Sequence, residues 1–140
     1  MIDSEKISRF GAYGMVFKDQ KLLLAKKKSG PYKDLWDFPG GGIEYGETPE
    51  FTLKREFLEE VAMQTHHSVL LKVITSNCEY VKGDKTIGFH HIGIIYKVDK
   101  VSPLANSIAR EEFKWVHPKE TGLNELTPFV KYMFEELKLI

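Results

Sequence analysis

Residues 41–60 read GGIEYGETPEFTLKREFLEE, and this segment carries the clearest structural signals in the sequence. Within it, Thr48-Pro49-Glu50 is a typical helix start, because it combines a hydroxyl N-cap, a proline at the first helical position and an acid in the first turn. We predict a helix from this point to about residue 62. The glycine- and proline-rich residues 29–31 and 38–42 before it predict a non-helical segment.

Three glutamates gather on one side of this predicted helix. At about 100° per residue, Glu56, Glu59 and Glu60 share one arc of about 100°. The apolar side chains lie on the opposite side, and they are Phe51, Phe57, Leu58 and Val61. We therefore expect one face of the helix to pack on a sheet and the other face to present the acids.

Charge pairing along the helix does not account for the glutamate cluster. Glutamates on a solvated face usually gain support from a lysine or arginine four residues later, but Met63 and Gln64 stand at those positions. Hard divalent cations take oxygen ligands, and a glycine-rich turn lets the backbone approach a ligand closely. The pattern therefore favours metal-assisted phosphate chemistry, with a solvated acidic face as the alternative.

The rest of the chain predicts strands with two interspersed helices. The expected strands are residues 9–18, 22–25, 69–81, 86–98 and 112–116, and a second helix begins at Thr127-Pro128. The continuous apolar run at 22–25 is typical of a strand buried on both faces. These elements predict an α+β or α/β sandwich.

Length and composition limit the classes of protein. The 140 residues fit a single domain spanning residues 1–140, and twenty basic and twenty acidic side chains cancel. A neutral balance argues against a nucleic-acid polymer as the partner, since such partners usually require a basic face. Cys78 is the only cysteine, which excludes an internal disulfide. No stretch is typical of a signal peptide or a membrane span, so we expect a cytoplasmic protein without a membrane partner.

A fixed spacing of polar positions links the acidic helix to a known family. Gly41 is followed after five residues by Glu47, and after seven more by residues 55–60, which read REFLEE. Over residues 41–63 this spacing resembles the Nudix box, whose pattern is G-x5-E-x7-R-E-U-x-E-E-x-G-U with U bulky and apolar. The resemblance implies an α/β/α sandwich with a mixed sheet. It also implies metal-dependent hydrolysis of a diphosphate linkage in a small, nucleotide-like molecule.

The resemblance further implies roles by motif position. The implied ligands of Mg²⁺ or Mn²⁺ are Glu56, Glu59, Glu60 and the carbonyl of Gly40. Glu47 is implied as the salt-bridge partner of Arg55, holding the loop to the helix. We favour Glu59 as the base that accepts the proton of the attacking water, with Glu111 or Glu112 from a later loop as alternatives.

Several residues outside the box are candidates for substrate contacts. Aromatic faces stack on any base, so Tyr32, Phe38 and the two tryptophans are considered, with core packing as their alternative fate. Tyr80 resembles a tyrosine of the diadenosine polyphosphate branch of the family. We single out Phe38, Tyr80 and Glu112 as the candidate contacts. His90 and His91 are adjacent in a predicted strand, must face opposite sides, and are expected to be structural.

The box departs from the family pattern at Ala62, where the family has glycine. Glycine at that position would end the helix in a left-handed conformation. Alanine either adopts the same conformation at a cost of about 1 kcal/mol or lets the helix run on slightly. Neither outcome affects a carboxylate.

Two other functions are compatible with the sequence. One is a nucleotide-sensing Nudix-like domain that binds without cutting, although the intact set of three glutamates argues against it. The other is a structural protein whose acidic helix pairs with a basic partner. The substrate stays open among nucleoside triphosphates, dinucleoside polyphosphates, nucleotide sugars and ADP-ribose, because loops set specificity in such folds. The oligomeric state also stays open.

Overall fold

The computed structural model describes residues 3–140, which form strands and helices along one continuous chain. In order, they are β1 (Asp3–Lys18), β2 (Lys21–Lys26), β3 (Trp36–Asp37), β4 (Gly40–Gly42), α1 (Pro49–Val61), β5 (Met63–Lys82), β6 (Lys85–Pro103), β7 (Phe113–Val116), the short 3-10 helices η1 (Pro118–Glu120) and η2 (Leu123–Glu125), and α2 (Pro128–Glu136). None of the helices in this part of the chain has the length and apolar character needed to cross a membrane.

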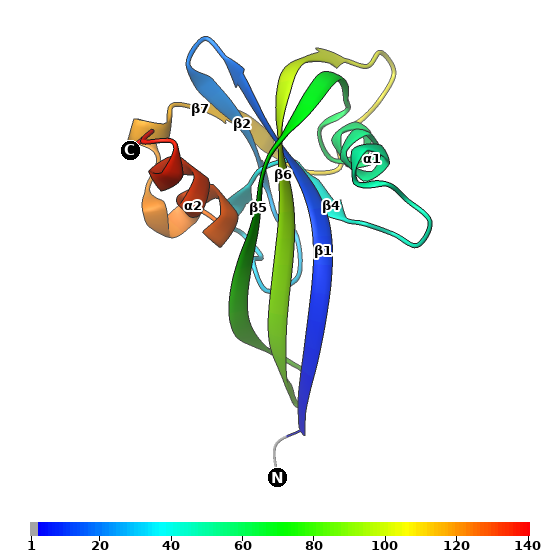
Figure 1. Ribbon diagram of the computed structural model, residues 1–140, viewed down its shortest axis with the longest axis vertical. Helices are drawn as coiled ribbons and strands as arrows, with labels where there is room; N and C mark the ends of the chain where they lie inside the picture. Colours follow the sequence, from blue (N-terminus) through cyan, green and yellow to red (C-terminus); the bar gives the residue numbers. More distant parts are fainter. Residues whose placement is uncertain (1–2) are drawn as a thin grey trace.

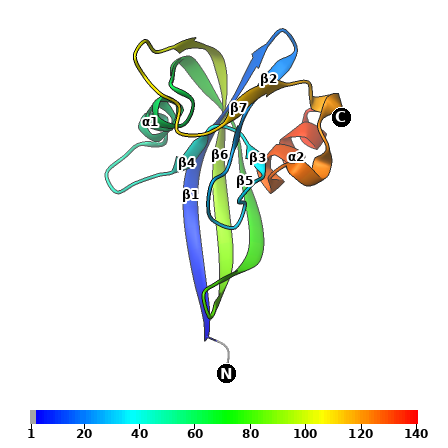
Figure 2. The same cartoon turned by 180° about the vertical axis from the view of Figure 1, so that it is seen from behind.

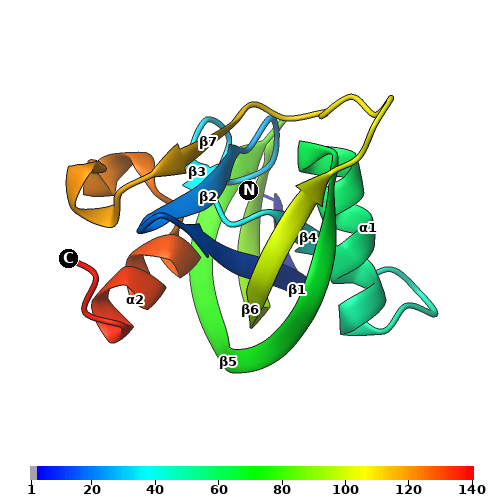
Figure 3. The same ribbon diagram turned by 90° about the horizontal axis from the view of Figure 1, so that it is seen from above.

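A mixed sheet forms the middle layer, with α1 on one face and α2 on the other (Figure 3). The strand order is β3-β2-β1-β6-β5, while β4 pairs with β1 and β7 pairs with β2. β1 and β6 run parallel, and the other pairs are antiparallel. The predicted sandwich with a mixed sheet is therefore confirmed.

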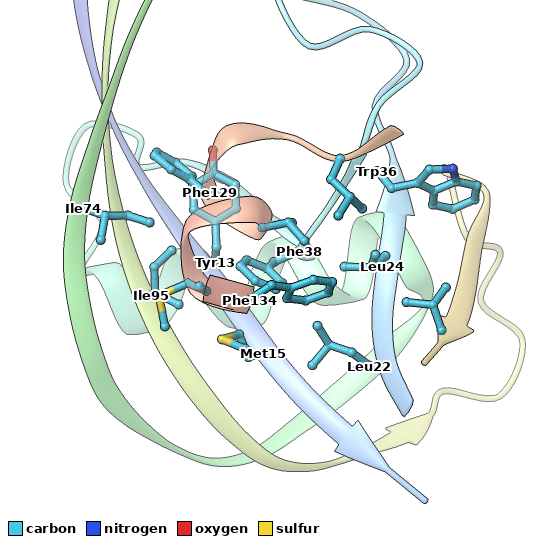
Figure 4. Packing of buried hydrophobic residues seen from close by; sticks show 14 residues of the cluster. Tyr13, Met15, Leu22, Leu24, Trp36, Phe38, Ile74, Ile95, Phe129 and Phe134 are labelled. Atoms are coloured by element: carbon cyan, nitrogen blue, oxygen red, sulfur yellow. The ribbon is translucent and has the colours of Figure 1, made fainter. Parts of the chain in front are cut away.

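The two helices cover separate hydrophobic clusters. Leu22 and Leu24 of β2 point toward α2, where they join the cluster that Figure 4 shows around Phe134. Leu23 and Ala25 point the other way and pack with the apolar residues of α1. Successive side chains of a strand face opposite sides, so an apolar run is needed where both faces are covered. The prediction of a strand buried on both faces is confirmed.

Three strands are much longer than predicted and form an arm that extends beyond the helices (Figure 1). β1 pairs with β6 continuously from Asp3 opposite Lys85 to Val16 opposite Val98. β5 begins directly after α1 and pairs with β6 as far as the turn at residues 83–84. His66 and His67, just beyond α1, belong to β5, and His66 Nε2 is 2.7 Å from Ser102 Oγ.

The packed face of α1 differs from the predicted one. The buried side chains of this helix are Thr52, Leu53, Phe57, Glu60 and Val61. Phe51 and Leu58, expected on the packed face, are exposed. The packed face is rotated toward the glutamates because β4 lies beside α1, so Glu56 and Glu60 border the sheet instead of facing away from it.

The helix ends at Val61, and Ala62 keeps the left-handed conformation that glycine would adopt. Ala62 has φ 54° and ψ 41°, and its backbone N–H donates to the carbonyl oxygen of Phe57. Of the two predicted outcomes, the retained geometry is the one found. The Cβ of alanine is strained in this region of φ, ψ space, so the chain holds a destabilising residue at this helix end.

Replacing Ala62 with glycine should therefore stabilise the protein by about 1 kcal/mol, which corresponds to a rise of about 3–4 °C in Tm. Ala105→Gly is the matched control, because Ala105 is an exposed loop residue without positive φ. Glycine there only adds freedom to the unfolded chain and should not stabilise. Thermal melts of the three proteins test this, and an unchanged or lower Tm for Ala62→Gly would contradict it.

Candidate functional site

Arg55 binds several acceptors at the start of the acidic cluster. Its Nε and Nη2 donate to the two carboxylate oxygens of Glu47 at 2.6 and 2.8 Å. Its Nη1 lies 2.9 Å from Glu56 Oε1 and 3.3 Å from Glu59 Oε2, and Nη2 also donates to the carbonyl of Gly42 at 3.2 Å. The guanidinium thus ties the loop before α1 and the strand β4 to the helix, as its bidentate geometry allows.

Glu47 is fixed from both sides. Besides Arg55, its Oε1 accepts hydrogen bonds from Thr52 Oγ1 at 2.8 Å and from the backbone N–H of Glu44 at 3.0 Å. The hydrogen bonds from Arg55 are the main reason that the pKa of Glu47 falls to about 2. Glu47 therefore stays ionised and acts as a structural anchor for Arg55.

Glu60 is buried against β4 and beside a lysine that the sequence did not single out. Its Oε1 accepts from the backbone N–H of Gly40 at 3.0 Å, and its Oε2 accepts from Lys27 Nζ at 3.3 Å. Lys27 Nζ also donates to the carbonyl of Gly40 at 3.2 Å. Burial raises the pKa of Glu60, and the charge of Lys27 opposes that effect. Burial alone would lower the pKa of Lys27, but nearby carboxylates, Glu60 first, outweigh it and raise the pKa.

A glycine at position 41 lets β4 approach the helix. A Cβ added to Gly41 would lie 2.7 Å from the carboxylate of Glu56, too close for any side chain to fit without a shift. Backbone and carboxylates therefore meet where the sequence predicted a close approach.

The loop between β6 and β7 runs past the end of α1 (Figure 2). The backbone N–H groups of Arg110 and Glu111 donate to the carbonyl oxygens of Glu59 and Glu60 at 3.1 and 3.0 Å. These bonds satisfy carbonyls that a helix end leaves free, and they bring two side chains to the cluster. Arg110 Nη2 lies 2.8 Å from Glu59 Oε2.

Glu111 is the fourth carboxylate of the site. Its Oε2 is buried and has no hydrogen-bond partner within residues 3–140. Burial raises the pKa of Glu111, the charge of Lys27 opposes this, and the charge of Glu56 reinforces it. Its neighbour Glu112 points elsewhere, with a side chain 69% exposed and 4.0 Å from Lys26 Nζ. Of the two candidates in this loop, only Glu111 faces the cluster.

The glutamates of α1 do not lack cationic partners, so that expectation from the sequence is wrong. Arg55 pairs with Glu56 and Glu59, and Lys27 pairs with Glu60. Arg55 precedes Glu59 by one helical turn, and Lys27 comes from the end of β2. Neither cation therefore stands four residues after a glutamate that it pairs with.

Beside β4 opens a cleft of about 640 Å³, and Lys27 lines it. Its aromatic walls include Tyr13, Tyr32, Tyr80, Phe89 and His91, and Arg9 and Lys82 add positive charge. Tyr80 and Tyr32 each meet Phe89 edge to face, at centroid distances of 6.2 Å. A second cavity of about 440 Å³ is lined by Arg9, Gly42 and Glu56. Arg9 and Gly42 border both spaces, so the aromatic cleft adjoins the cavity that Glu56 lines.

His91 lies in the wall of this cleft, while His90 faces the other way and is exposed, as predicted. The Nε2 of His91 is 2.8 Å from the hydroxyl of Tyr13, and the Nδ1 of His91 has no partner in the described part of the chain. Burial lowers the pKa of His91 to about 4. The ring is therefore neutral at pH 7 and offers one unused nitrogen beside the cleft.

The structure places the other predicted contacts differently. Phe38 has no exposed surface and belongs to the cluster beneath α2 (Figure 4), so it cannot reach a substrate. Its alternative fate, core packing, is the one found. Tyr80 lines the cleft, and Glu112 stands in solvent near Lys26. The prediction for Phe38 is therefore corrected to a core residue, while that for Glu112 stays a prediction, with its side chain away from the carboxylate cluster.

The residues around α1 suit a hard divalent cation in chemistry, although their side chains hold other partners. The donors are carboxylates and one carbonyl, the oxygen ligands that Mg²⁺ and Mn²⁺ prefer, and the buried Oε2 of Glu111 is unpartnered within residues 3–140. In the same range, no three His, Cys, Asp or Glu side chains are already arranged to hold a metal. The donor set fits such an ion once the carboxylates exchange their arginine and lysine partners.

Comparisons with known proteins show the family to which the chain is related. The family model described as NUDIX domain matches residues 8–137. An ADP-ribose pyrophosphatase of Methanocaldococcus jannaschii is 35% identical over 88 residues, which cover 63% of this chain and 48% of that protein. An 8-oxo-dGTP diphosphatase of Buchnera aphidicola is 38% identical over 52 residues, covering 36% and 40%. The matches thus span half or less of these curated relatives.

The fold is similar to that of solved structures. The MutT NUDIX hydrolase of Burkholderia pseudomallei superposes with a TM-score of 0.73 at 23% identity, over 94% of this chain and 98% of that one. At this identity the likeness concerns the fold.

Proposed function

The chain belongs to the Nudix family, and we propose from this that it hydrolyses a diphosphate linkage in a nucleotide-like substrate with the help of Mg²⁺ or Mn²⁺. The observation that carries the proposal is the gathering of four carboxylates, from α1 and the loop before β7, around the glycine strand β4. This cluster is joined through Arg9 and Gly42 to an aromatic cleft.

We assign the cation ligands to Glu56, Glu59, Glu60 and the carbonyl of Gly40. A divalent ion there would supply positive charge to the diphosphate oxygens and make a water acidic enough to attack phosphorus at neutral pH. Arg55 and Glu47 support these ligands without touching the substrate. Each ligand carboxylate is held by a cation of the chain, since Arg55 pairs with Glu56 and Glu59, and Lys27 pairs with Glu60.

We assign the role of base to Glu111. A base must accept the proton of the attacking water, and a carboxylate with a raised pKa and a free oxygen is suited to this. Glu59, favoured from the sequence, is paired with two arginines, which occupy its Oε2. In the step itself the water oxygen bonds to phosphorus, the bond to the bridging oxygen breaks, and the proton passes to Glu111.

The cleft is proposed to hold the nucleoside part of the substrate. Tyr32, Tyr80 and Phe89 offer faces on which a base can stack, while Arg9 and Lys82 supply positive charge for phosphates. The relatives act on ADP-ribose and on 8-oxo-dGTP, by their names. We therefore propose a nucleoside triphosphate, a dinucleoside polyphosphate, a nucleotide sugar or ADP-ribose as the substrate class.

Incubating the protein with compounds of these four classes, with Mg²⁺ or Mn²⁺ and with excess chelator, tests the proposal. We expect at least one compound to be cut at its diphosphate linkage, and the chelator to abolish the reaction. Glu56→Gln serves as the ligand-deficient comparison. Binding of an intact nucleotide without product in any condition would instead identify a sensor domain. If the protein neither bound nor cut any of these compounds, both functions would be contradicted.

A further inference from the structure

Lys27 occupies the place where the proposed function puts a divalent cation. Its ammonium donates to the carbonyl of Gly40 at 3.2 Å and to Glu60 Oε2 at 3.3 Å, and these are two of the four assigned ligands. The side chain is only 16% exposed, so solvent contributes little to its solvation. The charged ammonium is therefore held mainly by these oxygens and by the surrounding carboxylates.

A lysine and a divalent cation cannot share these two oxygens. Oxygen ligands lie about 2.0–2.6 Å from Mg²⁺ or Ca²⁺, so a cation bound there would come close to an ammonium that contacts the same atoms. Like charges at that separation in a partly buried place repel strongly. One of the two cations must leave when the other is bound.

Lys27 has a place to move to. Its side chain also lines the aromatic cleft, with Nζ 5.9 Å from the ring centroid of Tyr13. The cleft has a volume of about 640 Å³, and it shares the lining residues Arg9 and Gly42 with the cavity beside Glu56. Rotation of the side chain would carry the ammonium away from α1 while leaving β2 unchanged.

We propose that Lys27 is a built-in counter-ion that fills the position between Gly40 and Glu60 in the metal-free protein, competes there with the divalent cation, and turns into the cleft when that cation binds. This inference rests on the proposed function. Its consequence is that Lys27 weakens metal binding, while keeping the buried carboxylates compensated before the metal arrives.

Mn²⁺ binding to Lys27→Met, followed by calorimetry without any nucleotide, tests the competition. The substitution removes the charge and keeps an unbranched side chain, so Mn²⁺ should bind at least tenfold more tightly than to the wild type. Lys26→Met is the matched control, because Lys26 is the preceding residue but lies near Trp36 and Glu112. It should bind Mn²⁺ like the wild type. Equal or weaker binding to Lys27→Met would overturn the inference.

A measurement on the wild type keeps the inference testable if Lys27→Met does not fold. Acetylation of lysines by an activated ester, quantified by mass spectrometry, reports how accessible each amine is. Saturating Mg²⁺ should increase the acetylation rate of Lys27 severalfold relative to that of Lys26. An unchanged ratio would show that Lys27 does not move, which contradicts the inference.

The two proposals fail in different ways. If the wild type binds Mn²⁺ and Glu56→Gln weakens that binding, but Lys27→Met does not tighten it, the counter-ion inference fails and the metal site stands. If neither the wild type nor Lys27→Met binds Mn²⁺, the metal site itself fails and the inference falls with it. If Lys27→Met bound Mn²⁺ and the wild type did not, Lys27 would exclude the cation completely, which is the strongest form of the competition.

Discussion

Replacing Glu111 with glutamine should lower kcat by about 10²-fold or more on whichever substrate is cut fastest. Glutamine keeps the size of the side chain but cannot accept the proton of the attacking water. The fold should be preserved, because Glu111 Oε2 has no hydrogen-bond partner to lose within residues 3–140. Removing its charge also relieves repulsion with Glu56, so Tm should stay the same or rise slightly.

Glu112→Gln is the matched control for this prediction. Glu112 is the next residue of the same loop, but its side chain is largely exposed and faces Lys26. We expect its kcat to equal that of the wild type. Steady-state kinetics and a melting curve on each protein provide the readouts. If Glu111→Gln kept kcat within about threefold of the wild type, Glu59 would return as the base.

Arg55→Ala should cause the largest loss of stability of any single substitution considered for this site. The change removes a guanidinium that holds Glu47, Glu56, Glu59 and the carbonyl of Gly42, and it leaves partly buried carboxylates close together without compensation. Breaking such a network costs about 3 kcal/mol, or about 10 °C in Tm for a chain of this length. Activity should fall as well, because the ligand carboxylates lose their orientation.

Lys54→Ala is the comparison for Arg55→Ala, since Lys54 is the preceding residue of α1 and is exposed. The Tm of Lys54→Ala should be close to that of the wild type. Urea denaturation and turnover are measured on both variants. A loss of turnover with an unchanged Tm would mean that Arg55 contacts the substrate phosphates instead of supporting the site.

Much of this protein is determined by local sequence. Thr48, Pro49 and Glu50 begin α1 because capping and the restricted φ of proline act within one turn. Arg55 meets Glu47 because Glu47 directly precedes the N-cap of α1 and Arg55 lies within the first two turns of that helix. The alternation along β2 is likewise local, since strand geometry alone sends successive side chains to opposite faces. Features with a fixed short spacing were therefore predicted, and with them the family and the acidic helix.

The tertiary structure decided which charges meet that helix. Lys27 reaches Glu60 only because β2 and β4 both lie beside β1. Glu111 comes close to the helix only because the loop after β6 donates hydrogen bonds to the carbonyls at the end of α1. The orientation of α1 about its own axis, with Glu60 buried and Leu58 exposed, also depends on the contact of the helix with β4. The period of a helix tells which of its residues share a face, but it does not tell what the rest of the chain brings to that face. The sequence by itself therefore determined the proposed ligand carboxylates, and the register of separate strands and loops determined their proposed counter-ion, their proposed base and the cleft beside them.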